Sequence, residues 1–283
     1  MRLPPLEPGH TLQLLEGSAQ LFPALIEAFD QARQEIWLET YIFDFNGGSA
    51  EVAAALERAA ARGVAVRIVV DGFGTPDAPD AWRQRFHRAG VHWQVYAPVG
   101  SLGVLWPGSW RRLHRKLCVV DAAVAFCGGI NILDDLHDPN HGALEFPRLD
   151  FAVRVGGPLV QDMRQACSLL WQRLRAVHRL DPRAIGEVLR HPISGPPLAD
   201  ADAQRGAGRA RAALLLRDNL RRRSHIERAY VRAIGRAKTE VIIANAYFVP
   251  GRRLRRALAG AARRGVRVTL LLQGRYEYFM QYY

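Results

Sequence analysis

The chain has 283 residues, a formal net charge of +12 at pH 7 and a pI near 10.4. Its apolar fraction of 49% and charged fraction of 23% are typical of a globular protein. No stretch approaches the roughly 20 apolar residues of a membrane-spanning helix, and the first residues lack the hydrophobic core of a signal peptide. The excess of positive charge favours polyanionic partners, and both nucleic acid and an anionic membrane surface qualify.

Apolar periodicity predicts alternating helices and strands over the first hundred residues. Phe22, Leu25, Ile26 and Phe29 recur at helical spacing, which predicts an amphipathic helix over 20–33. Further patterns predict strands over 35–43, 64–70 and 91–96, and helices over 49–62 and 80–88. Alternation of elements of this length indicates an α/β layered fold with a mixed or largely parallel sheet.

The segment 98–112 interrupts this alternation with glycines, tryptophans and arginines. Trp106 and Trp110 are followed by Arg111 and Arg112, and indole rings favour the headgroup level of a bilayer. The segment is therefore either an interfacial loop or a loop that packs over the core.

The stretch 114–131 reads H-R-K-L-C-V-V-D-A-A-V-A-F-C-G-G-I-N and is predicted to form a tight strand pair around a D-A-A turn. Residues two apart on a strand face the same side, so His114 and Lys116 project together while Arg115 points away. An imidazole beside an ammonium suits a phosphoryl centre. Histidine can attack phosphorus or carry a proton, and lysine can neutralise the non-bridging oxygens.

A polar loop is expected over 134–149, where His137, Asp138 and His141 lie close in sequence. Their spacing matches no recognised metal-binding pattern, so no metal site is predicted. The cysteines sit in apolar surroundings, which favours core thiols in a reducing compartment: Cys118, Cys127 and Cys167.

Asp150 opens another predicted strand, D-F-A-V-R-V, and a long helix follows it to about residue 178. Over 191–213 Pro, Gly, Asp and Ala dominate without an apolar period, which predicts a linker between a first domain, 1–190, and a second, 214–283. Ser224 and Glu227 form a predicted capping box, which would begin a helix that runs to about residue 236.

Residues 224–274 repeat the pattern of residues 20–72. A helix, E-I-W-L-E-T-Y-I-F, a helix and R-G-V-A-V-R-I-V-V-D-G correspond to a helix, E-V-I-I-A-N-A-Y-F, a helix and R-G-V-R-V-T-L-L-L-Q-G. Gly63 and Gly265 correspond at an offset of 202 residues (265 − 63). The repeat predicts two copies of one structural unit, the second truncated. A second H-x-K motif is expected near position 316 (114 + 202), past the last residue of this sequence.

The complete spacing H-x-K-x4-D-x6-G-G resembles the signature of the phospholipase D superfamily, with every position filled. Further tracts resemble bacterial cardiolipin synthases of the short type without amino-terminal membrane spans: R-R-L-H-R-K-L-C-V-V-D, F-C-G-G-I-N, R-D-N-L-R-R-R, I-A-N-A-Y-F-V-P-G and L-L-L-Q-G-R-Y-E-Y. This resemblance implies a phospholipase D-like α-β-α fold, duplicated with an incomplete second copy, and a chemistry without metal or other cofactors.

The resemblance also implies catalytic roles. His114 is either the nucleophile or the general acid and base, and both options stay open. Lys116 holds the phosphate. Asp121, the third signature residue, is expected to stabilise the hairpin by polar contacts more than to touch substrate.

Four further residues are expected to support the site. Asn131 would help to hold the phosphate, and Gly128 and Gly129 would let the backbone approach it closely. Asp150 would either accept a hydrogen bond from the catalytic imidazole and so fix its tautomer, or cap the end of its strand.

The implied activity is transfer of a phosphatidyl group, which makes cardiolipin from phosphatidylglycerol through a phosphohistidine. The implied location is the cytoplasmic face of the bacterial inner membrane, as a peripheral protein. Two-copy members build one site between their halves, so this chain carries one half-site and is either a fragment of a longer protein or part of a homodimer. Three alternatives stay open: a phosphodiesterase nuclease, a lipid-hydrolysing phospholipase D and an inactive membrane-binding module.

Overall fold

The computed structural model describes residues 3–75, 77–97, 112–138, 142–178, 208–216, 224–246 and 248–273. They form two compact units, one over Leu6–Ala212 and one that contains the described residues from Ala213 onward. Trp106 and Trp110, His141 and most of the predicted linker lie outside the described residues. Among the described helices, none combines the length and the apolar character that crossing a bilayer requires.

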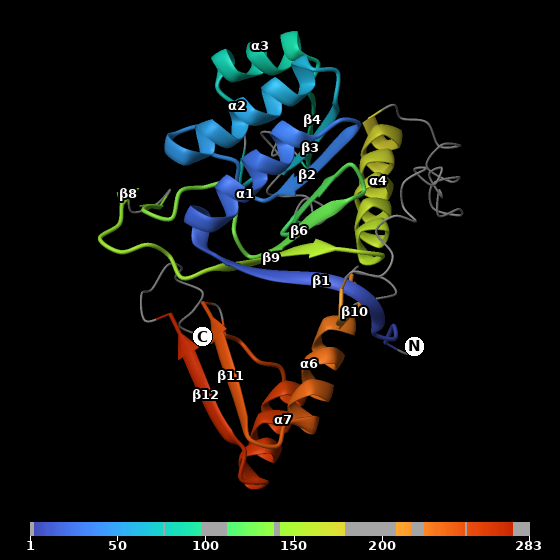
Figure 1. The fold of residues 1–283 in the computed structure, drawn as a ribbon. Helices are drawn as coiled ribbons and strands as arrows, with labels where there is room; N and C mark the ends of the chain where they lie inside the picture. Colours follow the sequence, from blue (N-terminus) through green and yellow to red (C-terminus); the bar gives the residue numbers. More distant parts are fainter. Residues whose placement is uncertain are drawn as a thin grey trace. The chain divides into compact units, whose positions relative to one another are not determined.

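The first unit is built on a mixed sheet of eight strands (Figure 1). In spatial order these are β10 (Ala210–Ala212), β1 (Glu7–Glu16), β9 (Phe151–Gly156), β6 (Val124–Gly128), β5 (Lys116–Val120), β2 (Glu35–Thr40), β3 (Ala65–Asp71) and β4 (His92–Tyr96). β2, β3 and β4 run parallel to one another, and the remaining neighbours pair antiparallel. This is the mixed α/β sheet that the alternating elements predicted.

Helices cover both faces of this sheet (Figure 1). One face carries α1 (Gly17–Gln31), α2 (Gly47–Ala61) and α3 (Asp80–Ala89), and the other carries α4 (Leu159–His178). Alternate residues of β2 serve the two faces. Ile36 and Leu38 join the core under α1 and α2, whereas Trp37 faces α4, where its ring lies 6.3 Å from that of Trp171.

Two strands of the sheet, β1 and β10, were not predicted from the sequence. β1 pairs with β9 along its second half, but its register with β10 shifts between Glu7 and His10, close to Gly9 with a φ of +93°. β1 starts with proline and glycine, which usually mark a loop. Its buried residues do not alternate along the strand, so its sequence lacks the apolar alternation that predicts a strand. β10 lies at the end of the predicted linker and pairs with β1, so this end of the linker belongs to the first sheet.

Smaller differences concern element boundaries. The strand predicted over 35–43 ends at Thr40. The polar loop after β6 contains a short hairpin of β7 (His137–Asp138) and β8 (Gly142–Ala143).

In the second unit, the described residues form α6 (His225–Arg236), β11 (Glu240–Asn245), α7 (Arg252–Arg263) and β12 (Arg267–Leu272). β11 and β12 pair in parallel, as β2 and β3 do. The predicted capping box is wrong, because the Ser224 side chain makes no capping hydrogen bond. The backbone of Ser224, with φ −115° and ψ 13°, is not in the extended conformation from which a serine caps a helix.

Candidate active site

The signature residues gather at one edge of the first sheet. β2 and β3 end at this edge, β5 begins there, β6 ends there, and Asp150 directly precedes β9. Lys116 is the first residue of β5 and pairs with Gly128, the last residue of β6. The strand order β9-β6-β5-β2-β3 thus brings residues from five segments to the carboxyl ends of the parallel strands, where open α/β sheets bind their ligands.

His114 and Lys116 project together, as their spacing predicted. Lys116 Nζ lies 3.1 Å from Nδ1 and 3.4 Å from Nε2 of His114. Arg115 points to the opposite face of the sheet, where its guanidinium pairs with buried Glu39 and donates to the carbonyl of Ala166. Strand alternation therefore separates a structural ion pair from the candidate catalytic pair.

Lys116 is held as a poorly solvated cation. Only 8% of the residue is exposed, and a small cavity beneath it is lined mainly by apolar side chains of α1, β2, β5 and β6. Burial lowers the pKa of Lys116 to about 8, although the negative charges of Asp150 and Asp71 oppose the shift. An ammonium that has lost its water has much to gain from a phosphate oxygen.

His114 is held mainly as a neutral imidazole. Burial lowers its pKa, and the charge of Lys116 lowers it further, while the charge of Asp71 acts in the opposite direction. When the Lys116 ammonium donates to Nδ1, the proton of the neutral ring lies on Nε2. In this arrangement the lone pair of Nδ1 is engaged by Lys116, and the ring can attack or accept a proton at Nδ1 once the ammonium has turned away.

Asp71 is part of the site and was not predicted to be. This carboxylate ends β3 and is fully buried. Its Oδ2 accepts a hydrogen bond of 2.6 Å from the backbone N–H of Leu113, directly before His114, and its Oδ1 accepts from Phe73 and Gly74 at 2.9 Å and 3.3 Å. Asp71 therefore fixes the backbone that carries His114 and places a negative charge near both catalytic candidates.

Tyr41 is a second residue that was not predicted. Its ring centroid lies 5.0 Å from that of His114, and Lys116 Nζ lies 5.6 Å from the same ring centroid. An aromatic face close to an ammonium attracts it and keeps water away. The sequence signal was only that Tyr41 lies near the carboxyl end of the strand predicted over 35–43.

Asn131 joins the end of β6 to the end of β2. Its Oδ1 accepts a hydrogen bond from the backbone N–H of Ile42 at 3.1 Å and lies 3.4 Å from the hydroxyl oxygen of Thr40. The Oδ1 atom thereby orients the amide, and no described residue accepts a hydrogen bond from Nδ2.

The two glycines are required by neighbouring protein groups. A Cβ at Gly129 would overlap the Asp150 carboxylate, and one at Gly128 would overlap the backbone of Phe151 and Ala152. The expectation was that these glycines admit a phosphate. The structure instead shows that they admit β9 and Asp150, which pack against the end of β6.

Asp150 has a different immediate partner from the one considered first. Its Oδ1 accepts a hydrogen bond of 2.8 Å from the N–H of Phe151, and among the described residues no hydrogen bond joins it to His114. Burial raises its pKa, while the Phe151 N–H and the charge of Lys116 act to lower it. In this structure Asp150 acts as a strand-end cap and as a counter-charge to Lys116.

Asp121 lies at the opposite end of β5 from the catalytic pair. Its carboxylate accepts hydrogen bonds of 2.8 Å from the backbone N–H groups of Arg33, Gln34 and Glu35, at the start of β2. These contacts are structural, and they tie the β5–β6 turn to its neighbouring strand.

Of the candidate metal ligands, His137 and Asp138 lie in β7, and His141 lies outside the described residues. Among the described residues, no group of three His, Cys, Asp or Glu side chains could hold a metal ion. The cysteines are free thiols, and Cys118 and Cys127 point to opposite faces of the sheet because Cys118 pairs with Phe126 and Cys127 with Leu117. Burial raises the pKa of both thiols.

Comparisons with known proteins agree with this arrangement. The family model described as cardiolipin synthase, PLD-like domain, matches residues 25–144 and 230–282. Cardiolipin synthase B of Salmonella typhi is 40% identical over 272 residues, which cover 94% of this chain and 60% of the relative. Cardiolipin synthase B of Escherichia coli K12 is 37% identical over 275 residues, with the same coverage. The chain thus spans about 60% of the length of these relatives.

A solved structure shows the same fold. Phosphatidylserine synthase from Haemophilus influenzae Rd KW20 superposes with a TM-score of 0.61 at 14% identity and covers 95% of this chain and 63% of its own. The matched family residues include His114, Lys116, Asp121 and Asn131. The chain therefore belongs to the family of cardiolipin synthase PLD-like domains.

Proposed function

We propose that this chain carries one catalytic half-site of a phosphatidyltransferase that makes cardiolipin from phosphatidylglycerol. The observation that supports it most is the contact between His114 and the desolvated Lys116 ammonium at the sheet edge. A buried lysine next to a neutral imidazole is prepared to bind a phosphodiester and to react with it. The names of the relatives, both called cardiolipin synthase B, supply the substrate class.

A phosphate that enters the site competes with His114 for Lys116. As the ammonium turns from Nδ1 to a non-bridging oxygen, the imidazole is released for reaction, and the Nδ2 amide of Asn131 donates to a second oxygen. Negative charge that develops on the equatorial oxygens is then neutralised by groups that already face it.

The transfer takes place in two displacements. An imidazole nitrogen attacks phosphorus, the bond from phosphorus to the glycerol oxygen breaks, and the departing glycerol takes a proton from a second imidazole. A hydroxyl of another phosphatidylglycerol gives its proton to that imidazole and attacks, and the phosphorus–nitrogen bond breaks. His114 fills one of these two roles, and the second His and Lys come from the remainder of a longer protein or from a second copy of this chain.

The proposed partner is an anionic phospholipid bilayer, and the proposed location is the cytoplasmic face of the bacterial inner membrane, as a peripheral protein. The net charge of +12 supports attraction to such a surface. Hydrolysis of phospholipid, cleavage of nucleic acid and simple membrane binding are outcomes of the test below.

The test is to incubate the chain with phosphatidylglycerol vesicles in EDTA, beside the His114→Ala variant. We expect cardiolipin and glycerol from the parent and neither from the variant. We also expect kcat/KM to fall as the pH rises above about 8, because the free protein then loses the charge of Lys116.

Other products would contradict the proposal. Phosphatidic acid in place of cardiolipin would make water the acceptor and the protein a hydrolase. Cleavage of DNA in EDTA without lipid turnover would make it a nuclease. If neither occurs, the same assay on a fusion of the chain to the part of cardiolipin synthase B that it does not match decides, and the inactivity of this fusion would refute the proposal.

A further inference from the structure

Large apolar side chains are exposed at the edge of the sheet that carries the candidate active site. They come from two connections, one after β3 and one between β6 and β9, and are Phe73 (59% exposed), Leu136 (51%), Phe146 (71%) and Leu149 (58%). We call these four residues the site rim. Isolated exposed apolar residues are common, but several at the mouth of one site indicate an interaction surface.

The connection between β6 and β9 runs from Gly129 to Asp150, and Asn131 and Asp150, near its two ends, belong to the site. Backbone hydrogen bonds hold its described residues, since the N–H of Leu144 donates to the carbonyl of Leu136 at 2.8 Å and the N–H of Arg148 donates to the carbonyl of Asp135 at 3.2 Å. Figure 1 shows the segment around β8 projecting outward beside α1. Its apolar side chains therefore stand on a supported loop.

The same connection is bound to the body of the unit. Asp135 accepts a hydrogen bond from the N–H of Ser18 in the first turn of α1, and the N–H of Asp135 donates to the Ser18 hydroxyl at 3.2 Å. Arg148 donates to the carbonyl of Asp134 at 2.8 Å. The position of Phe146 and Leu149 is thus coupled to α1, which also borders the cavity beneath Lys116.

Phe73 extends the rim to the other side of the catalytic pair. Its N–H is bound to Asp71, and the guanidinium of Arg112 lies 5.1 Å from the centre of its ring. Along this edge of the sheet, β6 and β9 lie on one side of β5, while β2 and β3 lie on the other. His114 and Lys116 therefore lie between the apolar connection after β6 and the apolar connection after β3.

We propose that the site rim inserts into the boundary between headgroups and acyl chains of a phospholipid bilayer and so brings the catalytic pair to the level of the lipid phosphate. This inference rests on the proposed function, because a phosphatidyl substrate lies in a membrane. A site that reaches its phosphate without extracting the lipid must bring its edge to headgroup depth. Apolar side chains on both sides of the site then leave water as they reach the acyl boundary.

Charge makes the rim distinguishable from general attraction to anionic lipid. Asp134, Asp135, Asp138 and Glu145 lie on the connection between β6 and β9, with Arg148 as its basic residue. A locally acidic segment does not gain from an anionic surface. The binding energy that the rim contributes is therefore expected to persist in high salt, whereas the contribution of the chain's net charge is screened.

The experiment compares two double variants for binding to sedimenting vesicles of phosphatidylcholine with phosphatidylglycerol, in low and in high salt. Phe146→Thr with Leu149→Thr removes part of the rim. Leu12→Thr with Leu14→Thr is the matched control, because these residues of β1 are 46% and 63% exposed but lie within the sheet. Thermal unfolding checks that both variants are folded as the parent is.

We expect the rim variant to bind vesicles at least about ten-fold more weakly than the parent, in both salts, and the control to bind within about two-fold of it. Three results would overturn the inference. The parent does not bind vesicles, the rim variant binds as tightly as the parent does, or the control variant loses as much affinity as the rim variant. A parent dimer that the rim variant converts to monomer would also overturn it, because a second copy would then be the occupant.

Vesicle binding tests this inference, and lipid turnover tests the proposed function, so the two can fail independently. His114→Ala is expected to bind vesicles as the parent does. Rim-dependent binding without lipid turnover, by the chain and by the fusion described above, would refute the proposed transferase and keep the docking surface. Cardiolipin formation that the rim variant leaves unchanged would support the proposed transferase and refute the docking surface.

Discussion

The segment α1-β2-α2-β3 of the first unit and the segment α6-β11-α7-β12 of the second carry the same arginine at the same place. Arg62 donates from Nη2 to the carbonyl oxygens of Phe29 and Ala32, at 2.7 Å and 3.5 Å, where α1 ends. Arg264 donates in the same way to residues 234 and 237, at 3.0 Å and 3.4 Å, where α6 ends. In each segment the second helix thus closes the exposed carbonyl end of the first.

The turn that follows is also the same in both segments. Gly63 and Gly265 have φ values of +90° and +84°, a left-handed conformation that glycine adopts without strain. After them, the N–H groups of Val64 and Val266 each donate to the carbonyl five residues earlier, at 3.1 Å. The shared glycine, arginine and valine therefore define how each helix leads into its strand.

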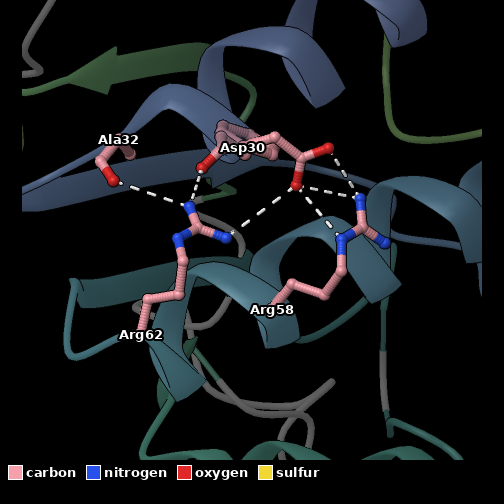
Figure 2. Close-up of polar contacts among 5 residues, drawn as sticks. Asp30, Ala32, Arg58 and Arg62 are labelled. Carbon is pink, nitrogen blue, oxygen red and sulfur yellow. Dashed lines mark hydrogen bonds and ion pairs between the residues drawn. The ribbon is translucent and has the colours of Figure 1, made fainter.

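The segments differ in the contacts added to this frame. In the first, Asp30 pairs with Arg58 at 2.9 Å and approaches Arg62 at 4.0 Å, as Figure 2 shows. At the corresponding positions of the second segment stand Gly235 and Gly260. The second segment keeps the shared arginine, glycine and valine but has no charged side chains at these two positions.

Burial differs still more. Every residue of β2 is buried, since β5 pairs with one of its edges and α4 packs on its second face. β11 and β12 contain no fully buried residue. At the end of β3 stands Asp71, and the corresponding residue after β12 is Gln273. The helix–turn–strand arrangement that both segments share is thus held by local contacts, whereas the site depends on β5, β6 and a buried carboxylate.

Replacement of Asp71 should give the largest effect. Asp71→Ala leaves three backbone N–H groups without their acceptor, so we expect the first unit to lose about 3 kcal/mol or more of its free energy of unfolding. Gln273→Ala is the matched change in the second segment and should cost less, because Gln273 is exposed whereas Asp71 is fully buried. Hydrogen exchange resolved to each unit measures both. Similar losses would show that the two strand ends are equivalent.

Replacement of Lys116 should stabilise the protein while it removes function. The folded pKa of about 8 lies below the ordinary lysine pKa of 10.5, so the folded state binds this proton less well than the unfolded state does. The resulting cost is complete below about pH 8 and disappears as the pH rises toward about 10.5. Lys116→Met should therefore raise the free energy of unfolding by about 1 to 3 kcal/mol at pH 7 and by progressively less above pH 8.

The chain itself offers the control for this measurement, because Lys238 is its only other lysine. Lys238 is exposed and belongs to the second unit. Lys238→Met should change the free energy of unfolding by less than about 0.5 kcal/mol. Destabilisation by Lys116→Met at pH 7, measured by urea unfolding, would show that its contacts outweigh its desolvation.

The two arginine caps should differ by a smaller amount. Arg62→Met should cost about 1 to 2 kcal/mol, because it removes two capping contacts and the approach to Asp30. Arg264→Met should cost about 1 kcal/mol, because it removes the caps alone. Hydrogen exchange in the last turns of α1 and α6 measures both. If Asp30→Asn leaves the difference between them unchanged, the ion-pair network is not its source.

Ser224 should have the smallest effect. A serine that caps a helix contributes about 1 kcal/mol, but Ser224 makes no such hydrogen bond. Ser224→Ala should therefore alter the free energy of unfolding by less than about 0.5 kcal/mol, as followed by the helical circular dichroism signal. A loss near 1 kcal/mol would restore the capping box that the sequence suggested.

The helices and the central strands followed from periodicity, because their apolar residues lie on one face or in continuous runs. The β5–β6 hairpin with His114 and Lys116 followed from alternation around the D-A-A turn. β1 was not predicted, because its proline and glycine are typical of a loop. It becomes a strand by pairing with β9, which lies far away in the sequence. β10 was hidden in the same way within a linker-like composition.

The site was predictable only as far as its motif. The role of Asp71 was not predicted, because one of its partners, the N–H of Leu113, lies 42 residues further along the chain. Tyr41 escaped because only the pairing of β2 with β5 brings its ring to His114. The role expected for Gly128 and Gly129 differed for the same reason, since β9 occupies the space beside them.

Asp121 gives the signature a geometric meaning beyond chemistry. It lies five residues after Lys116, about 17 Å along β5 at ~3.4 Å per residue, and it is bound to the first residues of β2. That attachment sets which residue of β5 faces which residue of β2. A slip by one position would turn His114 and Lys116 to the α4 face and bring Arg115 to the site. The interval between Lys116 and Asp121 thus acts as a ruler that decides which side of the sheet becomes reactive.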